Sequence, residues 1–335
     1  MTPPPNDDVQ QLERLANAVG GLRSQVAARI VGQRDAVDGV LTALLGGGHA
    51  LLVGVPGLAK TLLVSTVAEA LALSFNRVQF TPDLMPGDIT GTELVEEDLA
   101  TGKRSFRFVR GPIFAQVVLA DEINRTPPKT QAALLQAMQE HHVTVAGQTY
   151  QLPSPFFVLA TQNPIEQEGT YPLPEAQLDR FMLELRLGYP SRAEEETIVT
   201  QTTGMHLAEV KPVLDAAALA AMQSLVRRMP VSQSLIAAAV MLARMTRPGE
   251  GEAPALVREY VEWGAGPRAS QYLVLGAKAR AAMDGRPQAD LDDVKSVATA
   301  VLRHRVMTNF AAEAADLSSE DVVAELVASR DWHAN

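Results

Sequence analysis

The chain has 335 residues, of which 47% are hydrophobic and 20% charged, and it contains no cysteine. This length predicts about two domains. The missing thiols exclude a disulfide framework, a thiolate metal site and a cysteine nucleophile. Acidic residues outnumber basic ones by 39 to 29, for a net charge of -10, so the basic excess typical of proteins that bind duplex DNA or anionic membranes is missing.

The amino terminus carries no recognisable targeting signal. Residues 1–7 predict a disordered leader, because they have neither the basic start nor the apolar run of a signal peptide. No later stretch reaches the roughly 18 uninterrupted apolar residues that indicate a membrane-spanning helix. We therefore expect a soluble cytoplasmic protein without membrane contact. The six histidines lack zinc-type spacing, which argues against a protein-ligated transition metal.

The first half of the chain mixes helical and strand patterns. Apolar spacing predicts a helix over 9–28, interrupted at Gly20–Gly21, and a second over 36–45 that ends at three glycines. Five short apolar runs follow, separated by longer stretches such as the helical pattern over 60–73. This alternation favours a parallel sheet covered on both faces. The five predicted strands are 50–53, 77–80, 116–120, 156–160 and 181–185.

Two segments alternate with period 2 instead. Residues 93–109, with a turn at Thr101–Gly102, predict one β-hairpin, and 143–150 predict another. Beyond residue 190 only helical patterns remain. They cover 193–202, 215–229, 232–244, 267–283, 291–303 and 319–328. The predicted domains are an α/β domain over 8–190, a linker with a first helix over 191–212, and a helical domain over 213–335.

The string GVPGLAKT at 54–61 lies between a predicted strand and a predicted helix. In that context a glycine-rich turn lets backbone N–H groups surround phosphates at a helix amino terminus. Lys60 would reach the β- and γ-phosphates of ATP and the Thr61 hydroxyl would bind Mg²⁺. Ala59 stands where the general pattern has glycine, and the alternative is a turn that only links strand to helix. The residues expected to contact the nucleotide here are Gly54, Val55, Pro56, Gly57, Leu58, Ala59, Lys60, Thr61 and Leu62.

A second predicted strand ends in two carboxylates, Asp121 and Glu122. Ligands bind at the carboxyl ends of strands in parallel α/β sheets. Because adjacent residues of a strand point to opposite sides, the two acids can take different roles, Asp121 toward Mg²⁺ and Glu122 toward the attacking water. Alone, such a pair would be read as a solvated strand end. The phosphate loop favours the catalytic interpretation.

Three further polar residues are candidates. Asn163 follows another predicted strand and could orient water or contact the γ-phosphate, although before a proline it is also a typical turn former. Arg180 precedes the last strand and could pair with Asp179 or Glu184, or could enter a neighbouring molecule's nucleotide site. Arg268 lies in the first turn of a predicted helix, where an arginine is usually exposed to solvent.

Together these strings resemble an AAA+ ATPase, and more narrowly the MoxR family within the helix-2-insert clade. The matching strings are GVPGLAKT at 54–61, DEINR at 121–125, ATQNP at 160–164 and EAQLDRF at 175–181. The family's phosphate loop has the same Ala-Lys-Thr ending, which accounts for Ala59. The similarity extends from about residue 30 to about residue 306.

The resemblance implies a P-loop AAA+ fold, an α/β domain with a parallel five-stranded sheet in the order 5-1-4-3-2, followed by an all-helical lid domain. The hairpins over 93–109 and 143–150 would be the helix-2 insert and the pre-sensor-1 insert. Ile30, Val31, Gly32 and Gln33 would contact the adenine of ATP.

The resemblance also implies roles for the single polar residues and for partners. Asn163 would be sensor 1, Arg180 an arginine finger acting in trans, and Arg268 sensor 2 from the lid. Members of the family are generally thought to form hexameric rings and to act as chaperone-like ATPases. Their clients are often metalloenzymes, and they typically work with a protein that carries a von Willebrand factor A domain.

Three other functions remain open. The ATPase subunit of a metal chelatase would use the same site. A nucleic-acid motor is disfavoured by the net charge and because no Lys or Arg lies between His142 and Gln151, where a strand-tracking hairpin needs cations. A scaffold that binds nucleotide without hydrolysis is disfavoured by the presence of Lys60, Asp121, Glu122 and Asn163.

Overall fold

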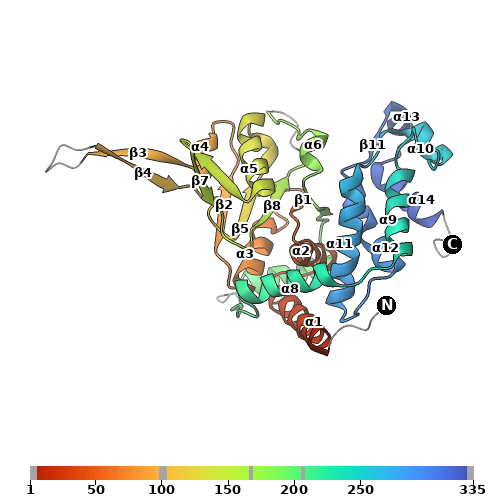
Figure 1. Cartoon of the computed structure of the whole chain (residues 1–335), viewed down its shortest axis with the longest axis horizontal. Coiled ribbons are helices and arrows are strands. Elements are labelled where there is room, and N and C mark those ends of the chain that lie inside the picture. The colour runs from red at the N-terminus through yellow and green to blue at the C-terminus, as the bar shows by residue number, and fades with distance from the viewer. Residues whose placement is uncertain (1–5, 98–103, 166–168, 205–207, 330–335) are drawn as a thin grey trace.

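The computed structural model describes residues 6–97, 104–165, 169–204 and 208–329. An α/β half is packed against a helical half, and a long hairpin extends from the α/β half (Figure 1). Residues 1–5 of the predicted leader and the predicted turn at Thr101–Gly102 lie outside the described residues.

Most of the predicted elements form within one to three residues of their expected bounds. The α/β half contains α1 (Asn6–Ala27), α2 (Arg34–Gly46), β1 (Ala50–Val53), α3 (Lys60–Ala70), β2 (Phe75–Gln79), α4 (Pro86–Thr90), β3 (Gly91–Glu97), β4 (Arg104–Arg110), β5 (Val117–Asp121), the 3₁₀ turn η1 (Ile123–Arg125), α5 (Pro128–Glu140), β6 (His142–Val145), β7 (Gln148–Gln151), β8 (Phe157–Gln162), α6 (Glu175–Leu178) and β9 (Leu183–Arg186). The predicted linker contains α7 (Arg192–Thr202). The helical half contains α8 (Ala216–Arg228), α9 (Gln233–Met245), α10 (Ala255–Tyr260), β10 (Val261–Trp263), α11 (Pro267–Met283), α12 (Leu291–Leu302), β11 (Met307–Thr308), α13 (Phe310–Ala314) and α14 (Ser319–Ala328).

The central sheet has the strand order β2-β5-β8-β1-β9, and every neighbouring pair is parallel. Numbered among the five sheet strands alone, this is the order 5-1-4-3-2, so the fold prediction is confirmed. Alternate side chains enter two different cores. In β1, Leu52 belongs to the core under α1, α2 and α3, whereas Leu51 belongs to the core under α5. The sheet is therefore buried on both faces.

Helix α1 corrects two predictions. It runs without a break through Gly20–Gly21, and it begins at Asn6, inside the predicted leader. Each glycine costs a helix about 1 kcal/mol of stability relative to alanine, but tertiary packing of an apolar face outweighs propensity. Here a Cβ on Gly21 would lie 3.1 Å from a methyl group of Val213, so the small residue permits close contact with the segment before α8.

Two antiparallel hairpins stand outside the main sheet. Strands β3 and β4 pair from Gly91↔Arg110 to Glu97↔Arg104 and project away from the body (Figure 1). Strands β6 and β7 form the shorter hairpin. The ring of Phe108 on β4 stacks on that of Tyr150 on β7, with centroids 4.0 Å apart. The two hairpins are thus joined at the base of the longer one.

The sequence did not indicate the two short helices α10 and α13 of the helical half, nor its antiparallel ladder between β10 and β11. The two strands have three and two residues and lie more than 40 residues apart in the chain. Runs this short show no periodicity, which is why only helices were predicted beyond residue 190.

No single helix in the described ranges is long and apolar enough to cross a membrane; α8 and α9 pass that test only as a pair bent by 94°.

The two halves share one hydrophobic core. Helix α11 packs against α2, and α8 contacts α1, α2 and α11. Residues of α2, β9 and α11, including Leu41, Leu185 and Leu273, belong to the same buried cluster. A Cβ on Gly48 would lie 2.5 Å from Cβ of Met182, so the glycines after α2 let the chain pass close to the start of β9. The lid is consequently packed firmly onto the α/β half.

Candidate functional site

Three parallel strands end at the same edge of the sheet, and each is followed by a predicted site residue. β1 leads into the phosphate loop, β5 into Asp121 and Glu122, and β8 into Asn163. β8 lies between the other two, and the backbone N–H of Gly54 donates to the Gln162 carbonyl at 3.3 Å. The structure therefore brings together the phosphate loop, both carboxylates and Asn163.

The phosphate loop has the backbone of a phosphate cradle. Gly57 has a φ of 86° and Ala59 a φ of 56°, and left-handed residues in such turns aim successive N–H groups at one point. Ala59 therefore adopts a backbone conformation that glycine favours, although for alanine this conformation costs roughly 1–2 kcal/mol. Lys60 is the first residue of α3, and its Nζ donates to the Gly54 carbonyl at 2.5 Å and the Val55 carbonyl at 3.2 Å.

Asp121 is buried and held on both oxygens. The hydroxyl of Thr161 on β8 donates to its Oδ1 at 2.6 Å. The guanidinium of Arg77 on β2 donates to its Oδ2 twice, at 2.7 and 3.0 Å. Thr161 also accepts from the backbone N–H of Glu122 at 2.8 Å. One buried hydroxyl thus fixes the positions of both acidic residues.

Glu122 lies at the amino end of η1 with a left-handed φ of 57°. Its Oε2 accepts from Nε2 of Gln79 at 2.7 Å and from Nη1 of Arg125 at 2.8 Å. Among the described residues no hydrogen bond to Oε1 is found, so that oxygen can accept from a water molecule. Gln79 also accepts from Arg77 at 2.5 Å, which makes a continuous chain of polar contacts between the two acids.

Sequence reasoning missed four of these residues: Arg77, Gln79, Arg125 and Thr161. The first two lie two positions apart on β2, and a period-2 pair of polar residues on a strand next to the acidic one is the signal that could have identified them. Arg125 follows the acidic pair by only three residues. Thr161 is polar within an apolar strand.

Asn163 is buried beside the phosphate loop. Its Oδ1 accepts from the backbone N–H of Ile165 at 3.1 Å, which is the turn-forming contact that the sequence left open. The same residue thus serves the turn and lies at the edge where a nucleotide would bind, so the two interpretations are compatible.

The predicted adenine segment lies next to the phosphate loop. Nε2 of Gln33 donates to the Gly188 carbonyl at 2.8 Å, and a Cβ on Gly54 would lie 3.1 Å from the carbonyl oxygen of Leu187. The two segments therefore meet at the residues that follow β9. Gly32 and neighbouring residues line a cavity of about 400 Å³ with an apolar wall from α1 and α2, a size that accepts a base.

Arg180 and Arg268 lie at the other edge of the sheet. Arg180 precedes β9, whose first residue, Leu183, is paired with Ala50 at the start of β1. Its Nη1 donates to the Leu135 carbonyl at 2.6 Å, and it forms an ion pair with neither Asp179 nor Glu184. Both arginines line one small cavity of about 190 Å³. A strand length, about 13 Å at 3.3 Å per residue, separates them from the phosphate loop of their own chain.

The side chain of Arg268 is partly exposed to solvent, as its position in the first turn of α11 suggested, but it also forms an ion pair. Its Nη1 donates to Oδ2 of Asp179 at 2.8 Å, which ties the first turn of α11 to the segment that carries Arg180. The structure thus brings the two arginines together and does not bring them to Lys60, Asp121, Glu122 or Asn163.

The residues at the carboxyl edge fit Mg²⁺ in chemistry. Thr61 and Asp121 offer hard oxygen ligands of the kind that magnesium prefers, and Mg²⁺ commonly uses one or two protein oxygens together with substrate phosphates. No group of three or more His, Cys, Asp or Glu side chains suited to a metal occurs in the described part of the chain. A metal bound here would depend on the nucleotide for most of its ligands.

Comparison with known proteins agrees with this geometry. Residues 49–183 match the family described as "ATPase family associated with various cellular activities (AAA)", and residues 253–326 match an AAA lid domain. The chain is 43% identical over 299 residues to "Chaperone MoxR1" of Mycobacterium tuberculosis, covering 89% of this chain and 78% of that protein. It is 30% identical over 306 residues to "Protein MoxR" of Methylorubrum extorquens, covering 87% and 88%.

A solved structure is similar throughout. It is the crystal structure of a protein from Cytophaga hutchinsonii whose assignment as an ATPase is itself inferred. The two chains are 37% identical and superpose with a TM-score of 0.88, covering 96% of this chain and 97% of the other.

Thr161→Val tests whether the hydroxyl shared by Asp121 and Glu122 stabilises the site, and Thr66→Val is the matched control. Thr161→Val leaves a buried carboxylate oxygen and a backbone N–H without partners, so we expect a loss of about 1–3 kcal/mol in the free energy of unfolding, measured by urea titration, and a fall in ATP hydrolysis. Thr66 is also fully buried, but its hydroxyl has no hydrogen-bond partner among the described residues. Thr66→Val is therefore expected to be neutral or stabilising, and equal losses in both variants would contradict the role of the shared hydroxyl.

Proposed function

Because the chain belongs to the MoxR family of AAA+ ATPases, we propose that it hydrolyses ATP with Mg²⁺ at the carboxyl edge of its sheet and uses the reaction to remodel client proteins. One observation carries the proposal. Lys60 follows a phosphate loop that contains left-handed residues, and Asp121 and Glu122 lie at the end of β5, which is two strands away from β1 in the sheet. A turn that only linked a strand to a helix would not need the acidic residues beside it.

The hydrolysis follows from these placements. The phosphate-loop N–H groups and Lys60 bind the phosphates, so Lys60 exchanges its two carbonyl contacts for phosphate oxygens. Glu122 orients a water molecule and accepts its proton as the water oxygen bonds to the γ-phosphorus and the bond to the β–γ bridging oxygen breaks. Asn163 orients the same water or the γ-phosphate. Bound Mg²⁺ would neutralise charge on the phosphate oxygens, held by Thr61 and Asp121.

The positions of the two arginines support catalysis between subunits. Neither Arg180 nor Arg268 can span a strand length to its own phosphate loop, whereas a second copy can present both to the γ-phosphate, where an arginine stabilises developing charge. Closed rings arise when such a head-to-tail contact repeats. We therefore propose a ring, a hexamer by resemblance to the family, in which each subunit completes the site of the next.

The biological role proposed is that of a chaperone. One relative is described as a chaperone, and the family resemblance extends this to maturation or activation of clients, often metalloenzymes, together with a von Willebrand factor A protein. The ATPase subunit of a metal chelatase is the alternative. A metal-insertion assay with candidate partners separates the two, because only a chelatase subunit would make insertion depend on ATP.

A nucleic-acid motor has less support. The β6–β7 hairpin contains no Lys or Arg, and on the longer hairpin Arg104 and Arg107 are paired with Glu97 and Glu96. Backbone phosphates are bound by cations that can release their counterions. Hydrolysis stimulated by single-stranded DNA in a salt-sensitive way would favour the motor instead.

Lys60→Ala tests the phosphate loop. Hydrogen bonds to charged groups are worth about 1.5–3 kcal/mol, so ATP affinity is expected to fall by at least ~10–100-fold in a calorimetric or fluorescent-nucleotide titration. Lys295→Ala, which removes a lysine from the surface of α12, serves as the control and should bind normally. Unchanged affinity in Lys60→Ala would remove Lys60 from the site.

Glu122→Gln tests the general base. The amide keeps the shape of the side chain but accepts no proton, so ATP binding is retained while hydrolysis falls by the ~10²–10⁴-fold typical of a lost general base, measured as phosphate release. Glu196→Gln, on the exposed face of α7, should hydrolyse normally. Near-normal turnover in Glu122→Gln would exclude Glu122 from the mechanism. The same variant, loaded with ATP, is the bait for a von Willebrand factor A partner.

Arg180→Ala tests catalysis between subunits. Turnover should fall while ATP binding by isolated subunits is unchanged, because the arginine acts on a neighbour. Mixing Arg180→Ala with Glu122→Gln should recover activity, since some interfaces then combine an intact Glu122 with an intact Arg180. Arg258→Ala removes an exposed arginine from α10 of the lid and serves as the control. This variant should keep normal turnover on its own, and mixing it with Glu122→Gln should not raise its activity. If no ratio of the two subunits recovers activity, Arg180 does not act in trans.

A further inference from the structure

We propose that Arg305, acting through Asp179, is a positioning residue that locks Arg180 and Arg268 into one unit, so that the two arginines are presented to a neighbouring nucleotide together. The inference rests on the proposed function, in which both arginines act in trans. It assigns a role to Arg305 and Asp179, which are not among the residues proposed to contact ATP.

Arg305 follows α12 and is 5% exposed. Its Nη2 donates to the backbone carbonyls of Asp179 at 2.9 Å and Phe181 at 2.6 Å, and its Nη1 donates to the Met182 carbonyl at 3.3 Å. These carbonyls belong to the residue before Arg180 and to the two residues after it. A guanidinium has five N–H donors in a fixed plane, so one lid side chain fixes the backbone on both sides of Arg180.

Asp179 extends this unit to the second arginine. Its Oδ1 accepts from Nε of Arg305 at 2.8 Å and its Oδ2 from Nη1 of Arg268 at 2.8 Å. The single carboxylate therefore lies between two guanidinium groups and offsets the repulsion between them. Arg305 is buried, and burial lowers its pKa, but an arginine remains protonated in proteins. Removing the negative charge would leave two close cations without compensation.

Tyr272 supplies a further connection. It lies one helical turn after Arg268 on α11, so both side chains share a face of the helix. Its hydroxyl donates to the Arg180 carbonyl at 3.4 Å, and the Arg305 guanidinium lies over its ring, 5.2 Å from the centroid. The Arg180 carbonyl and the carbonyls on either side of it are therefore contacted by lid side chains, whereas the Arg180 N–H donates to the Gln177 carbonyl of α6 at 3.1 Å.

The expected benefit is geometric. Misplacing a catalytic group by about 1 Å can cost on the order of 10²-fold in rate. Because Arg180 and Arg268 are long side chains on different halves of the chain, the shared core alone does not fix the distance between their guanidinium groups. The Arg305–Asp179 unit fixes that spacing before a neighbouring subunit is engaged.

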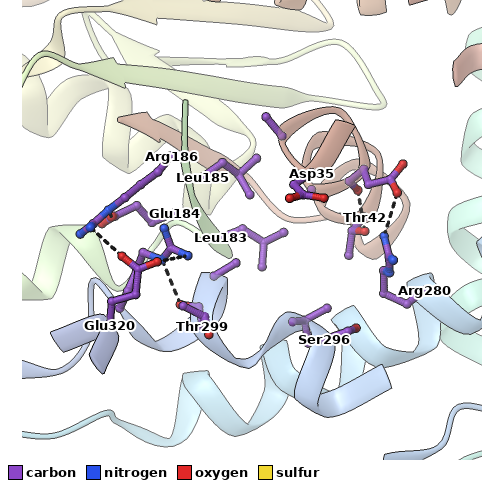
Figure 2. Close-up of a pocket in the computed structure, with 16 residues that line it drawn as sticks. Asp35, Thr42, Leu183, Glu184, Leu185, Arg186, Arg280, Ser296, Thr299 and Glu320 are labelled. Atoms are coloured by element: carbon purple, nitrogen blue, oxygen red, sulfur yellow. Dashed lines mark hydrogen bonds and ion pairs between the residues drawn. The ribbon is translucent and has the colours of Figure 1, made fainter. Parts of the chain in front are cut away.

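The structure offers a matched control in Asp38 on α2. It too accepts from two arginines, Arg23 at 2.7 Å and Arg280 at 3.2 Å. Arg280 lies on α11, the helix of Arg268, and reaches toward α2 beside a cavity of about 380 Å³ between the two halves (Figure 2). Asp38→Asn thus breaks a contact of the same composition between the halves, at a place away from Arg180.

The test compares Asp179→Asn with Asp38→Asn in the full chain, alone and mixed with Glu122→Gln. Asp179→Asn should keep its ATP affinity and KM, whereas kcat should fall by at least about tenfold. Mixing with Glu122→Gln should recover activity, because the intact arginine unit of one subunit then serves the intact Glu122 of the other. Asp38→Asn should keep wild-type kcat. Tyr272→Phe, which deletes only one hydroxyl, should show a smaller fall in kcat with the same recovery.

The outcomes separate this inference from the proposal on which it rests. If Arg180→Ala recovers in the mixture but Asp179→Asn and Tyr272→Phe do not, their defects lie in their own subunit and the positioning role is overturned. If Asp38→Asn loses as much kcat as Asp179→Asn, the effect is general loosening of the lid and the inference is likewise overturned. If Arg180→Ala itself shows no recovery, catalysis in trans is refuted.

Discussion

All five strands of the sheet run in the same direction, and this constraint determines how the site is divided. Parallel strands place every carboxyl end at one edge and every amino end at the other. The phosphate loop, Asp121 and Glu122 follow strand ends, whereas Arg180 precedes a strand. No rearrangement of side chains within one subunit brings the two groups together. A site that needs both must be completed by another copy, so the topology itself favours assembly.

The carboxyl edge is also organised more tightly than its motif residues alone suggest. Thr161 holds Asp121 and the backbone of Glu122, and Gln79 with Arg125 holds the Glu122 carboxylate. Thr161 and Gln79 lie on the sheet strands β8 and β2, and Arg125 lies in the short turn η1 directly after β5. Rigid elements that restrict the rotamers of catalytic side chains are what makes a site selective for one geometry of attack.

The sequence allowed the local parts of this arrangement to be predicted and not the long-range parts. The phosphate loop and the acidic pair are contiguous strings with a known context, so both were identified with the strands that carry them. Arg77 and Gln79 were missed because their contacts cross between strands and depend on register. The contact of Asp179 with Arg305 joins residues 126 positions apart, and no local pattern encodes such a pair. Gly20–Gly21 misled because packing of the apolar face of α1, rather than helix propensity, keeps the helix continuous.

The hydrophobic core shared by the two halves limits how the protein can convert hydrolysis into movement. Separating α11 from α2 would expose residues such as Leu41 and Leu273, which are fully buried, at about 25 cal/mol for each Å² of apolar surface. A subunit that keeps this core intact moves as a single rigid body. In the proposed ring, we therefore expect mechanical work to take the form of rotation of whole subunits against one another, with the β3–β4 hairpin moving farthest because it projects from the body (Figure 1).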